Sequence, residues 1–353
     1  MATLGKIVGV LLLAAVVVSG ILGWRASGPI HDEQLEGAPI DVEIAEPGVA
    51  LTFARSGERV LLVVAADADG VTAVDVSRIN NREFGDGIEI FNAFGYEALT
   101  YVARASTQTY AWADLDLPFD PAYPHIAAGT NFRAHAEEVG HEGDPFLFPK
   151  LSRATRWNAP VNTGSRLDYE VELCAVPLSV HTTETPASLG YVICNDFTER
   201  WTLVRDIDLD APMGTTAFPA AKGGDTRLPI GALLVIPADA YAFYEDLELE
   251  LYVNGALHQR ARAGLMIWAP DEILDQAMAR CDTPFQLGDE TVALVGCDSV
   301  PARTLILTGT PEGVAFNPIN LWNPGAYLGD GDEVISRATH LGSLINRVTA
   351  PAD

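Results

Sequence analysis

The stretch Leu167–Val176, LDYEVELCAV, carries the pattern that decides the fold of this chain. Apolar and acidic side chains alternate along it, as they do in a β-strand with one apolar face. A second stretch, 189–196 (LGYVICND), is an apolar run that predicts a neighbouring strand ending at Asn195 and Asp196. This pair of stretches predicts two neighbouring β-strands.

Turn and helix signals on both sides of this pair extend the picture. Residues 131–140 (NFRAHAEEVG) predict a short helix that stops at its glycine, and residues 269–279 (APDEILDQAMA) predict a helix that begins at its proline. The pair Asn254-Gly255, between two alternating runs, predicts a β-hairpin. Residues 304–314 (TLILTGTPEGV) predict a buried strand that ends in a turn. The fold class we expect is therefore α+β and β-rich.

The segment before this region shows another texture. From about residue 41 to residue 124 the chain contains apolar stretches such as 60–70 (VLLVVAADADG) and 97–105 (EALTYVARA), separated by turn residues. We interpret these stretches as short strands. They predict a small N-terminal β module and linker over residues 29–124.

The composition excludes several classes of protein. Of the 353 residues, 48% are hydrophobic and 20% are charged, which is typical of a globular chain and not of a disordered one. The 22 basic residues stand against 48 acidic residues, for a formal net charge of −26. Nucleic-acid binding relies on clusters of basic side chains, so we expect no nucleic-acid partner. Only three of the basic residues are lysines: Lys6, Lys150 and Lys222.

An uncharged apolar run, residues 7–24 (IVGVLLLAAVVVSGILGW), lies between Lys6 and Arg25. Its length meets the lower limit for a helix that crosses a bilayer. A cleaved signal peptide is the alternative, but residues 18–20 resemble its small-residue cleavage site only weakly. We therefore expect an N-terminal transmembrane helix within residues 1–28 and a body anchored at the membrane on the extracytoplasmic (periplasmic) side. The cytoplasmic side and cleavage of the segment stay open.

The acids of the central strands form a candidate metal site. Glu170 and Glu172 are two residues apart on one strand and point the same way, and Asp196 ends the neighbouring strand. Buried acids are costly unless they are paired or bound to a cation. Ligation by oxygen alone favours Mg²⁺, with Mn²⁺ or Ca²⁺ next. The other interpretation is a half-exposed strand whose acids face water.

Cys174 and Cys194, within apolar runs, are expected to be core thiols.

The predicted helix 131–140 carries a candidate base. His135 and Glu138 are three residues apart and lie on one face of a helical turn. A carboxylate that orients a histidine in this way allows the imidazole to take a proton from water. The alternative is a solvated helix face on which Glu138 is an ordinary surface charge.

Taken in order, these segments resemble the fumarylacetoacetate hydrolase family. The resemblance covers residues 125–349 and implies that they form the catalytic domain. The stretches that carry it are GTNFRAHAEEVG (129–140), FPKLSRA (148–154), LDYEVELCAV (167–176), LGYVICNDFTER (189–200), AAKGGDTRLPIGALLV (220–235), LELELYVNGALHQRARAGLMIWAPDEIL (247–274), LILTGTPEGVAFNP (305–318) and LGDGDEV (328–334).

The resemblance implies a mixed β-sheet roll with the active site at its mouth, usually in a homodimer. It implies a Mg²⁺ or similar ion on the three carboxylates, with His135 and Glu138 as the pair that activates water. Lys222 would stabilise the negative charge that develops on the substrate, together with the metal. The residues that the resemblance places on the substrate are Arg200, Gly309 and Thr310.

The sequence departs from the family pattern in three places. Residues 201–203 (Trp-Thr-Leu) replace a stretch that helps to bind substrate, and Gly223-Gly224 replace a Ser-Phe-like pair. An insertion at 281–301 places Cys281 and Cys297 at the two ends of a loop. These cysteines form either a disulfide or two unpaired thiols.

Three functions are compatible with this sequence. The first is a metal-dependent hydrolase that cleaves a C–C bond in an acylpyruvate or related 2,4-dioxo acid. The second is a decarboxylase or an enol–keto isomerase of an unsaturated dicarboxylate. The third is a non-catalytic, membrane-tethered protein that binds carboxylates. The retained chemical groups favour the hydrolase, with a small 2-oxo acid as substrate.

Overall fold

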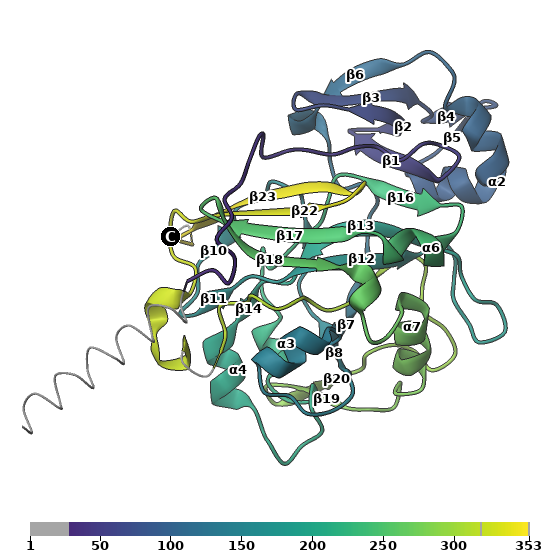
Figure 1. The fold of residues 1–353 in the computed structure, drawn as a ribbon. Helices are drawn as coiled ribbons and strands as arrows, with labels where there is room; N and C mark the ends of the chain where they lie inside the picture. The colour runs from purple at the N-terminus through teal and green to yellow at the C-terminus, as the bar shows by residue number, and fades with distance from the viewer. Residues whose placement is uncertain (1–27, 318–319, 352–353) are drawn as a thin grey trace, which may run out of the picture.

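The structure is a computed structural model and describes residues 28–317 and 320–351. Two sheets dominate it (Figure 1). The larger has ten strands in the order β6 (Gln108–Ala111), β3 (Gly70–Asp75), β2 (Arg59–Ala66), β1 (Ala50–Ser56), β16 (Leu234–Pro237), β13 (Leu189–Asn195), β12 (Val171–Pro177), β21 (Thr304–Leu307), β7 (Ala122–Gly129) and β8 (Phe146–Lys150). The smaller has five, in the order β10 (Val161–Asn162), β23 (Gly342–Thr349), β22 (Glu333–Ala338), β17 (Glu248–Val253) and β18 (Ala256–Arg262).

Short strand pairs and helices complete the fold. The pairs are β11 (Leu167–Asp168) with β14 (Thr198–Glu199), β15 (Leu228–Pro229) with β9 (Ala154–Thr155), β19 (Phe285–Leu287) with β20 (Glu290–Val292), and β4 (Arg78–Ile79) with β5 (Arg82–Glu83). The α-helices are α2 (Gly87–Val102), α3 (Arg133–Glu138), α4 (Arg200–Asp206), α5 (Phe218–Ala221), α6 (Ala240–Glu245) and α7 (Pro270–Met278). The expected β-rich α+β class is confirmed, and the sheets are mixed because β21–β7 and β10–β23 are parallel pairs.

The central strand prediction is confirmed, with a break inside it. The stretch 167–176 forms β11 and then β12, and Tyr169 and Glu170 lie between the two strands. Strand β12 pairs with β13 in antiparallel register, Val171 opposite Asn195. All seven residues of each of these strands are buried, because other elements cover both faces of the sheet.

The outer elements also follow their local signals. The predicted hairpin is β17–β18, with Asn254 at φ 50° and Gly255 at φ 85°, the positive angles that a two-residue turn of this type requires. The helix expected over 269–279 is α7, and the helix expected over 131–140 is α3, followed by Gly140 at φ 72°. These elements could be predicted without knowledge of the tertiary structure. At each of them the residue type favours the backbone conformation that the structure has there.

The interpretation of residues 97–105 as a strand is wrong, because they lie at the end of helix α2 and just beyond it. Asp86 caps this helix by accepting a hydrogen bond from the backbone N–H of Glu89. Thr100, Tyr101 and Val102 favour strands intrinsically, yet they lie in the helical segment that follows a break at Gly95, where Leu99 is buried.

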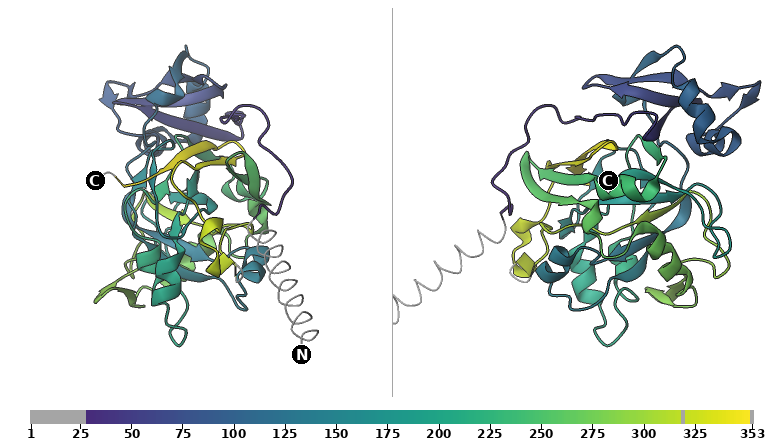
Figure 2. Two further views of the ribbon diagram at one scale, coloured as in Figure 1. Left: turned by 90° about the vertical axis from the view of Figure 1, so that its left-hand side faces the viewer. Right: turned by 45° about the vertical axis from the view of Figure 1, so that its right-hand side comes forward.

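The N-terminal strands do not form a separate sheet. Strand β1 pairs with β16, Ala50 opposite Pro237, so β6, β3, β2 and β1 extend the large sheet from one edge. One continuous hydrophobic core contains Phe53 and Leu61 as well as Ile193 and Leu307. Figure 2 shows this N-terminal part covering one end of the molecule. The predicted domain boundaries after residues 28 and 124 stay a prediction.

Among the residues that the structure describes, no helix is long and apolar enough to cross a bilayer. This finding contradicts the expected membrane-anchored, extracytoplasmic localisation, and that expectation is withdrawn. The apolar run 7–24 on which it was based lies outside the described residues.

The expectation of core thiols is also wrong. Cys174 on β12 and Cys194 on β13 form a disulfide, with Cα atoms 5.8 Å apart. The strand register places Cys174 opposite Val192 and Cys194 opposite Glu172, so the two cysteines are diagonal neighbours on the sheet. An apolar sequence context is the same for a buried thiol and a buried disulfide, and only the register distinguishes them.

Candidate active site

The topology brings the candidate residues to one end of the large sheet. Because β12 is antiparallel to both β13 and β21, the start of β12 lies beside the ends of those two strands. Strand β7 runs parallel to β21, so helix α3, which follows β7, reaches the same end. Figure 1 shows α3 and α4 at the end of the molecule opposite β1, β2 and β3.

Three carboxylates meet at this end. Glu170, Glu172 and Asp196 are 4%, 2% and 0% exposed, and one oxygen of each lies within 4.8 Å of the others. Backbone hydrogen bonds hold two of them in place: Gly309 donates to Glu172 Oε2 at 2.6 Å, and Asp196 donates its N–H to the carbonyl of Glu170 at 2.9 Å. The acids are therefore buried together and do not face water.

Three buried cations surround this cluster. Lys222 Nζ bonds to Glu170 and lies 2.8 Å from Asp196 Oδ2. Arg200 bonds to Glu170 and donates from Nε to Asp168 Oδ2 at 2.8 Å. Lys150 Nζ lies 2.6 Å from Asp196 Oδ1. With Asp168 the cluster has four carboxylates and three cations, and among the described residues Glu172 is the carboxylate without a cationic partner.

Glu172 is the carboxylate of this cluster whose ionised form is least favoured. Burial raises the pKa of Glu172 well above its usual range, and the neighbouring charges of Asp196 and Glu170 raise it further. Burial alone would also raise the pKa of Glu170, but Lys222 and Arg200 outweigh it and lower that pKa to about 2. Burial favours the neutral amine of Lys222, yet Asp196 and Glu170 reverse this and raise its pKa, so Lys222 is an ammonium group.

The carboxylate cluster fits a hard divalent cation. Among the described residues, no basic group lies within ion-pair distance of Glu172, and neither oxygen of Asp196 accepts a hydrogen bond of good geometry. All candidate donors are carboxylate oxygens, which Mg²⁺, Mn²⁺ and Ca²⁺ prefer. A divalent cation here would favour the ionised form of Glu172, which burial and the neighbouring carboxylates disfavour.

The predicted His–Glu pair is formed. His135 Nδ1 lies 3.1 Å from Glu138 Oε2, and the imidazole is buried. The N–H of Gly313 donates to Glu138 Oε1 at 3.0 Å and so fixes the carboxylate. Since Nδ1 faces Glu138, the other ring nitrogen, Nε2, is left for a second partner.

A cavity of about 370 Å³ connects these groups. His135, Glu170, Arg200, Lys222 and Thr310 all line it. This volume falls in the range of small-molecule sites, about 300–1,000 Å³. The structure thus places these five candidates around one space of a size that suits a small ligand.

The residues expected to contact substrate already have partners within the chain. Thr310 lines the cavity but donates its hydroxyl to the carbonyl of Val171 at 3.0 Å and accepts from Gln259 Nε2 at 2.8 Å. Gly309, at φ 93°, has its N–H on Glu172. A substrate-contacting role for these residues and for Arg200 stays a prediction.

Sequence reasoning assigned no role to Lys150, Asp168 or Gln259. Lys150 is 0% exposed, and Asp168 accepts the N–H groups of Ala315 and Phe316 as well as the Arg200 guanidinium. Two features of the sequence could have drawn attention to Lys150: it ends the apolar stretch 146–150, and the chain has only three lysines. Neither Asp168 nor Gln259 stands out from the surrounding alternation.

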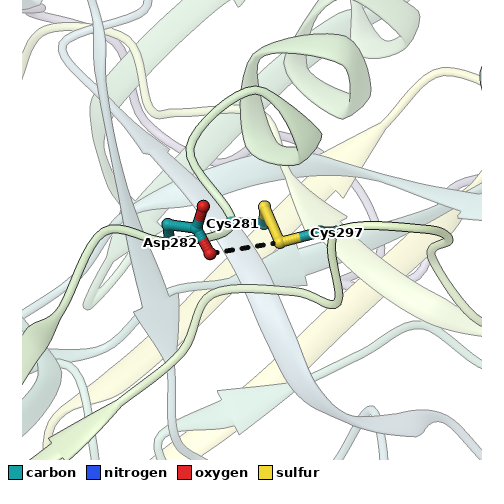
Figure 3. Close-up of side chains that lie close together, drawn as sticks. All are labelled: Cys281, Asp282 and Cys297. Carbon is teal, nitrogen blue, oxygen red and sulfur yellow. Dashed lines mark hydrogen bonds between the residues drawn. A yellow bond between two sulfur atoms is a disulfide. The ribbon is translucent and has the colours of Figure 1, made fainter.

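The two cysteines of the insertion form a disulfide, which resolves the alternative left by the sequence. Figure 3 shows Asp282 beside it, with Oδ1 3.4 Å from the Sγ of Cys297. This group resembles a metal site by residue type. Disulfide sulfurs are not thiolates, however, and do not supply the ligand that a soft metal requires.

The fold and the site define a β-rich α+β enzyme with a buried carboxylate cluster beside a cavity for a small molecule. The chain belongs to the fumarylacetoacetate hydrolase family, because the family model described as fumarylacetoacetate (FAA) hydrolase C-terminal matches residues 124–349. The resemblance seen in the sequence is thereby confirmed.

Individual relatives differ in activity. The chain is 28% identical over 242 residues to oxaloacetate tautomerase YisK from Bacillus subtilis, covering 65% of this chain and 70% of the relative. A putative HpcE protein from Mycobacterium smegmatis has the same fold, with a TM-score of 0.62, 24% identity and coverage of 86% of this chain and 100% of that one. A maleylpyruvate hydrolase from Sphingobium sp. SYK-6, solved with manganese(II) and pyruvate, has a TM-score of 0.58 at 19% identity, with coverage of 86% and 100%.

Proposed function

We propose that this protein is a divalent-metal-dependent hydrolase that cleaves the C–C bond of an acylpyruvate or related 2,4-dioxo acid. The observation that carries the proposal is the contact between His135 Nδ1 and Glu138, because His135 lines the same cavity as Glu170 of the carboxylate cluster. Hydrolysis needs a group that deprotonates water beside a group that binds the 2-oxo acid, and this cavity offers both.

The carboxylates of Glu170, Glu172 and Asp196 would hold the metal ion. Mg²⁺ fits this donor set, and Mn²⁺ or Ca²⁺ are alternatives. When bound, the ion supplies Lewis-acid polarisation of the substrate's oxygens. The related fold of a hydrolase solved with manganese(II) and pyruvate supports this assignment.

The protein groups divide the remaining work. Glu138, held by Gly313, keeps His135 oriented, so that its Nε2 takes the proton of a water molecule that attacks the distal ketone carbon. Cleavage of the C–C bond leaves negative charge on the pyruvate fragment. Lys222, whose neighbours keep it charged, stabilises that developing charge.

The test uses the full chain and a panel of 2,4-dioxo acids, with pyruvate release measured in Mg²⁺ and in EDTA. We expect metal-dependent release, and a loss of about 10²–10⁴-fold in kcat for His135→Asn. The matched control is His141→Asn, because His141 lines the same cavity outside the pair. Absence of pyruvate release from every member of the panel would refute the hydrolase assignment.

A second candidate is an enol–keto isomerase or a decarboxylase of a related 2-oxo acid. The relative named oxaloacetate tautomerase supports it. This chemistry requires the metal and an acid–base group but no attacking water. Full enol–keto conversion of oxaloacetate by His135→Asn, without pyruvate release from the 2,4-dioxo acids by the wild type, would favour the isomerase, and release of CO₂ together with pyruvate from oxaloacetate would favour the decarboxylase. The homodimer stays a prediction, which sedimentation of the full chain would test.

A further inference from the structure

The cavity has two chemically different ends. Its polar end contains His135, Glu170, Arg200 and Lys222, which the proposed function assigns to the 2-oxo acid. The other end, which we call the apolar arm, consists of hydrophobic side chains from β8, α4, α5 and the loop that follows α4. Its members include Phe146, Phe218, Leu203, Val204, Ile207 and Met213.

Helix α4 sets the direction of the apolar arm. Arg200, Leu203 and Val204 have the spacing i, i+3 and i+4 on α4, which places them on one helical face, and Ile207, at i+7, is the C-cap of the helix. Arg200 reaches Asp168 and Glu170, and the apolar members follow along the chain away from that contact. At 1.5 Å per residue, the distance along the axis from Arg200 to Ile207 is about 10 Å.

An aromatic wall joins the arm to the polar end. The ring of Phe218 lies 4.9 Å from that of Phe146 and 5.1 Å from that of Phe148, measured between centroids. Lys222 Nζ lies 5.4 Å from the Phe148 ring centroid. A ligand with its carboxylate near Lys222 therefore meets hydrocarbon directly beyond that group.

The arm lacks a cation for a second acidic group. Among the described residues that line the cavity, the basic ones are His135, His141, Arg200 and Lys222. Arg200 and Lys222 are paired with buried acids, and His135 with Glu138. His141 has its Nε2 3.1 Å from the carbonyl of Asp144. A carboxylate placed against these hydrophobic side chains would thus exchange part of its hydration for contact with hydrocarbon without gaining a charged partner.

We propose that the substrate carries an apolar tail at the end distant from its 2-oxo acid group, and that the enzyme discriminates against substrates with a second carboxylate. This inference rests on the proposed function, because it places the 2-oxo acid at the polar end. Two residues that line the cavity agree with it, since Leu209 and Met213 are hydrophobic although they are 80% and 38% exposed. An acyl chain entering the arm would remove this apolar surface from water.

The test measures binding, so that it does not depend on turnover. Pyruvate, 2-oxohexanoate and 2-oxohexanedioate are titrated calorimetrically into the full chain with Mg²⁺. The last two have the same length and differ in a terminal carboxylate. We expect 2-oxohexanoate to bind at least about tenfold more tightly than either of the others, because its extra methylenes are buried and uncharged.

A variant pair locates the effect. Val204→Arg puts a cation into the arm and should reverse the preference between 2-oxohexanoate and 2-oxohexanedioate. Thr202→Arg adds the same charge on α4 at a position that does not line the cavity, and should leave the preference unchanged. Retention of the wild-type order by Val204→Arg would overturn the placement of the tail.

The outcomes separate this inference from the proposed function. Equal binding of the three ligands, or tighter binding of 2-oxohexanedioate, overturns the apolar-tail inference and leaves the hydrolase assignment intact. Tail preference without pyruvate release from any acylpyruvate supports the inference and overturns the hydrolase. Absence of both binding and turnover overturns both.

Discussion

Replacement of Lys150 by methionine is expected to lower the free energy of unfolding by about 3–5 kcal/mol, the usual cost of breaking a buried ion pair from one side. Lys150 and Asp196 are both 0% exposed, and their charged atoms are 2.6 Å apart. Lys150 also donates to the carbonyl of Arg227 at 3.0 Å. Because Lys222 remains on the other oxygen of Asp196, the value should fall toward the lower limit.

The partner substitution should cost less. Burial lowers the pKa of Lys150 to about 8 even with Asp196 present to raise it. In Asp196→Asn the amine would therefore lose its proton near neutral pH and avoid an unpaired charge. The double variant Lys150→Met/Asp196→Asn should be less destabilised than the sum of the single variants by more than about 1 kcal/mol.

Urea denaturation of the full chain in EDTA, followed by tryptophan fluorescence, measures these differences. Arg55→Met is the control, since Arg55 pairs with the largely exposed Asp120 at 2.8 Å and should cost less than about 1 kcal/mol. A Lys150→Met variant as stable as the control, or additive single substitutions, would refute the buried-pair argument.

Three further predictions address other parts of the molecule. Burial lowers the pKa of His125 to about 3, so between pH 6.5 and pH 3 only the unfolded chain binds a proton at this residue. As the pH is lowered through this range, the free energy of unfolding should therefore fall by about 1.4 kcal/mol per pH unit. Denaturation at stepped pH should show a shallower fall for His125→Asn than for His141→Asn. All four cysteines are in disulfides, so a thiol reagent should find no free thiol in the denatured, unreduced protein, and one or more reactive thiols would contradict the pairing. Mg²⁺ at about 100 times its Kd should raise the free energy of unfolding by about 2.7 kcal/mol, which a thermal shift assay detects. The shift should be lost in Glu172→Gln and kept in the control Glu142→Gln, which changes an exposed acid. An equal shift in both variants would argue against the carboxylate site.

The polar end of the site was largely predictable because its signals are local. The alternation of 167–176 places Glu170 and Glu172 on one side, and the helical spacing of His135 and Glu138 brings them together. Each pair is close in sequence and needs no knowledge of the fold, although Glu170 lies just before β12 and not within it. Asp196 required one further assumption, that the two apolar stretches are neighbours.

Contacts between distant segments were not predictable in this way. Lys150 meets Asp196 across 46 positions, and Gln259 meets Thr310 across 51, because strand order and register bring them together. No residue pattern in either segment indicates the other. Tertiary burial likewise turned 97–105 from an expected strand into part of a helix and its end.

The sequence by itself determined the residue types of the site, the main strands and the hairpin, since side-chain period and turn chemistry are properties of short stretches. The tertiary structure alone decided which acids are paired, which cysteines are joined, and where the cavity changes from charged to apolar. Those features depend on pKa shifts from burial and on side chains of separate elements meeting at the end of one sheet.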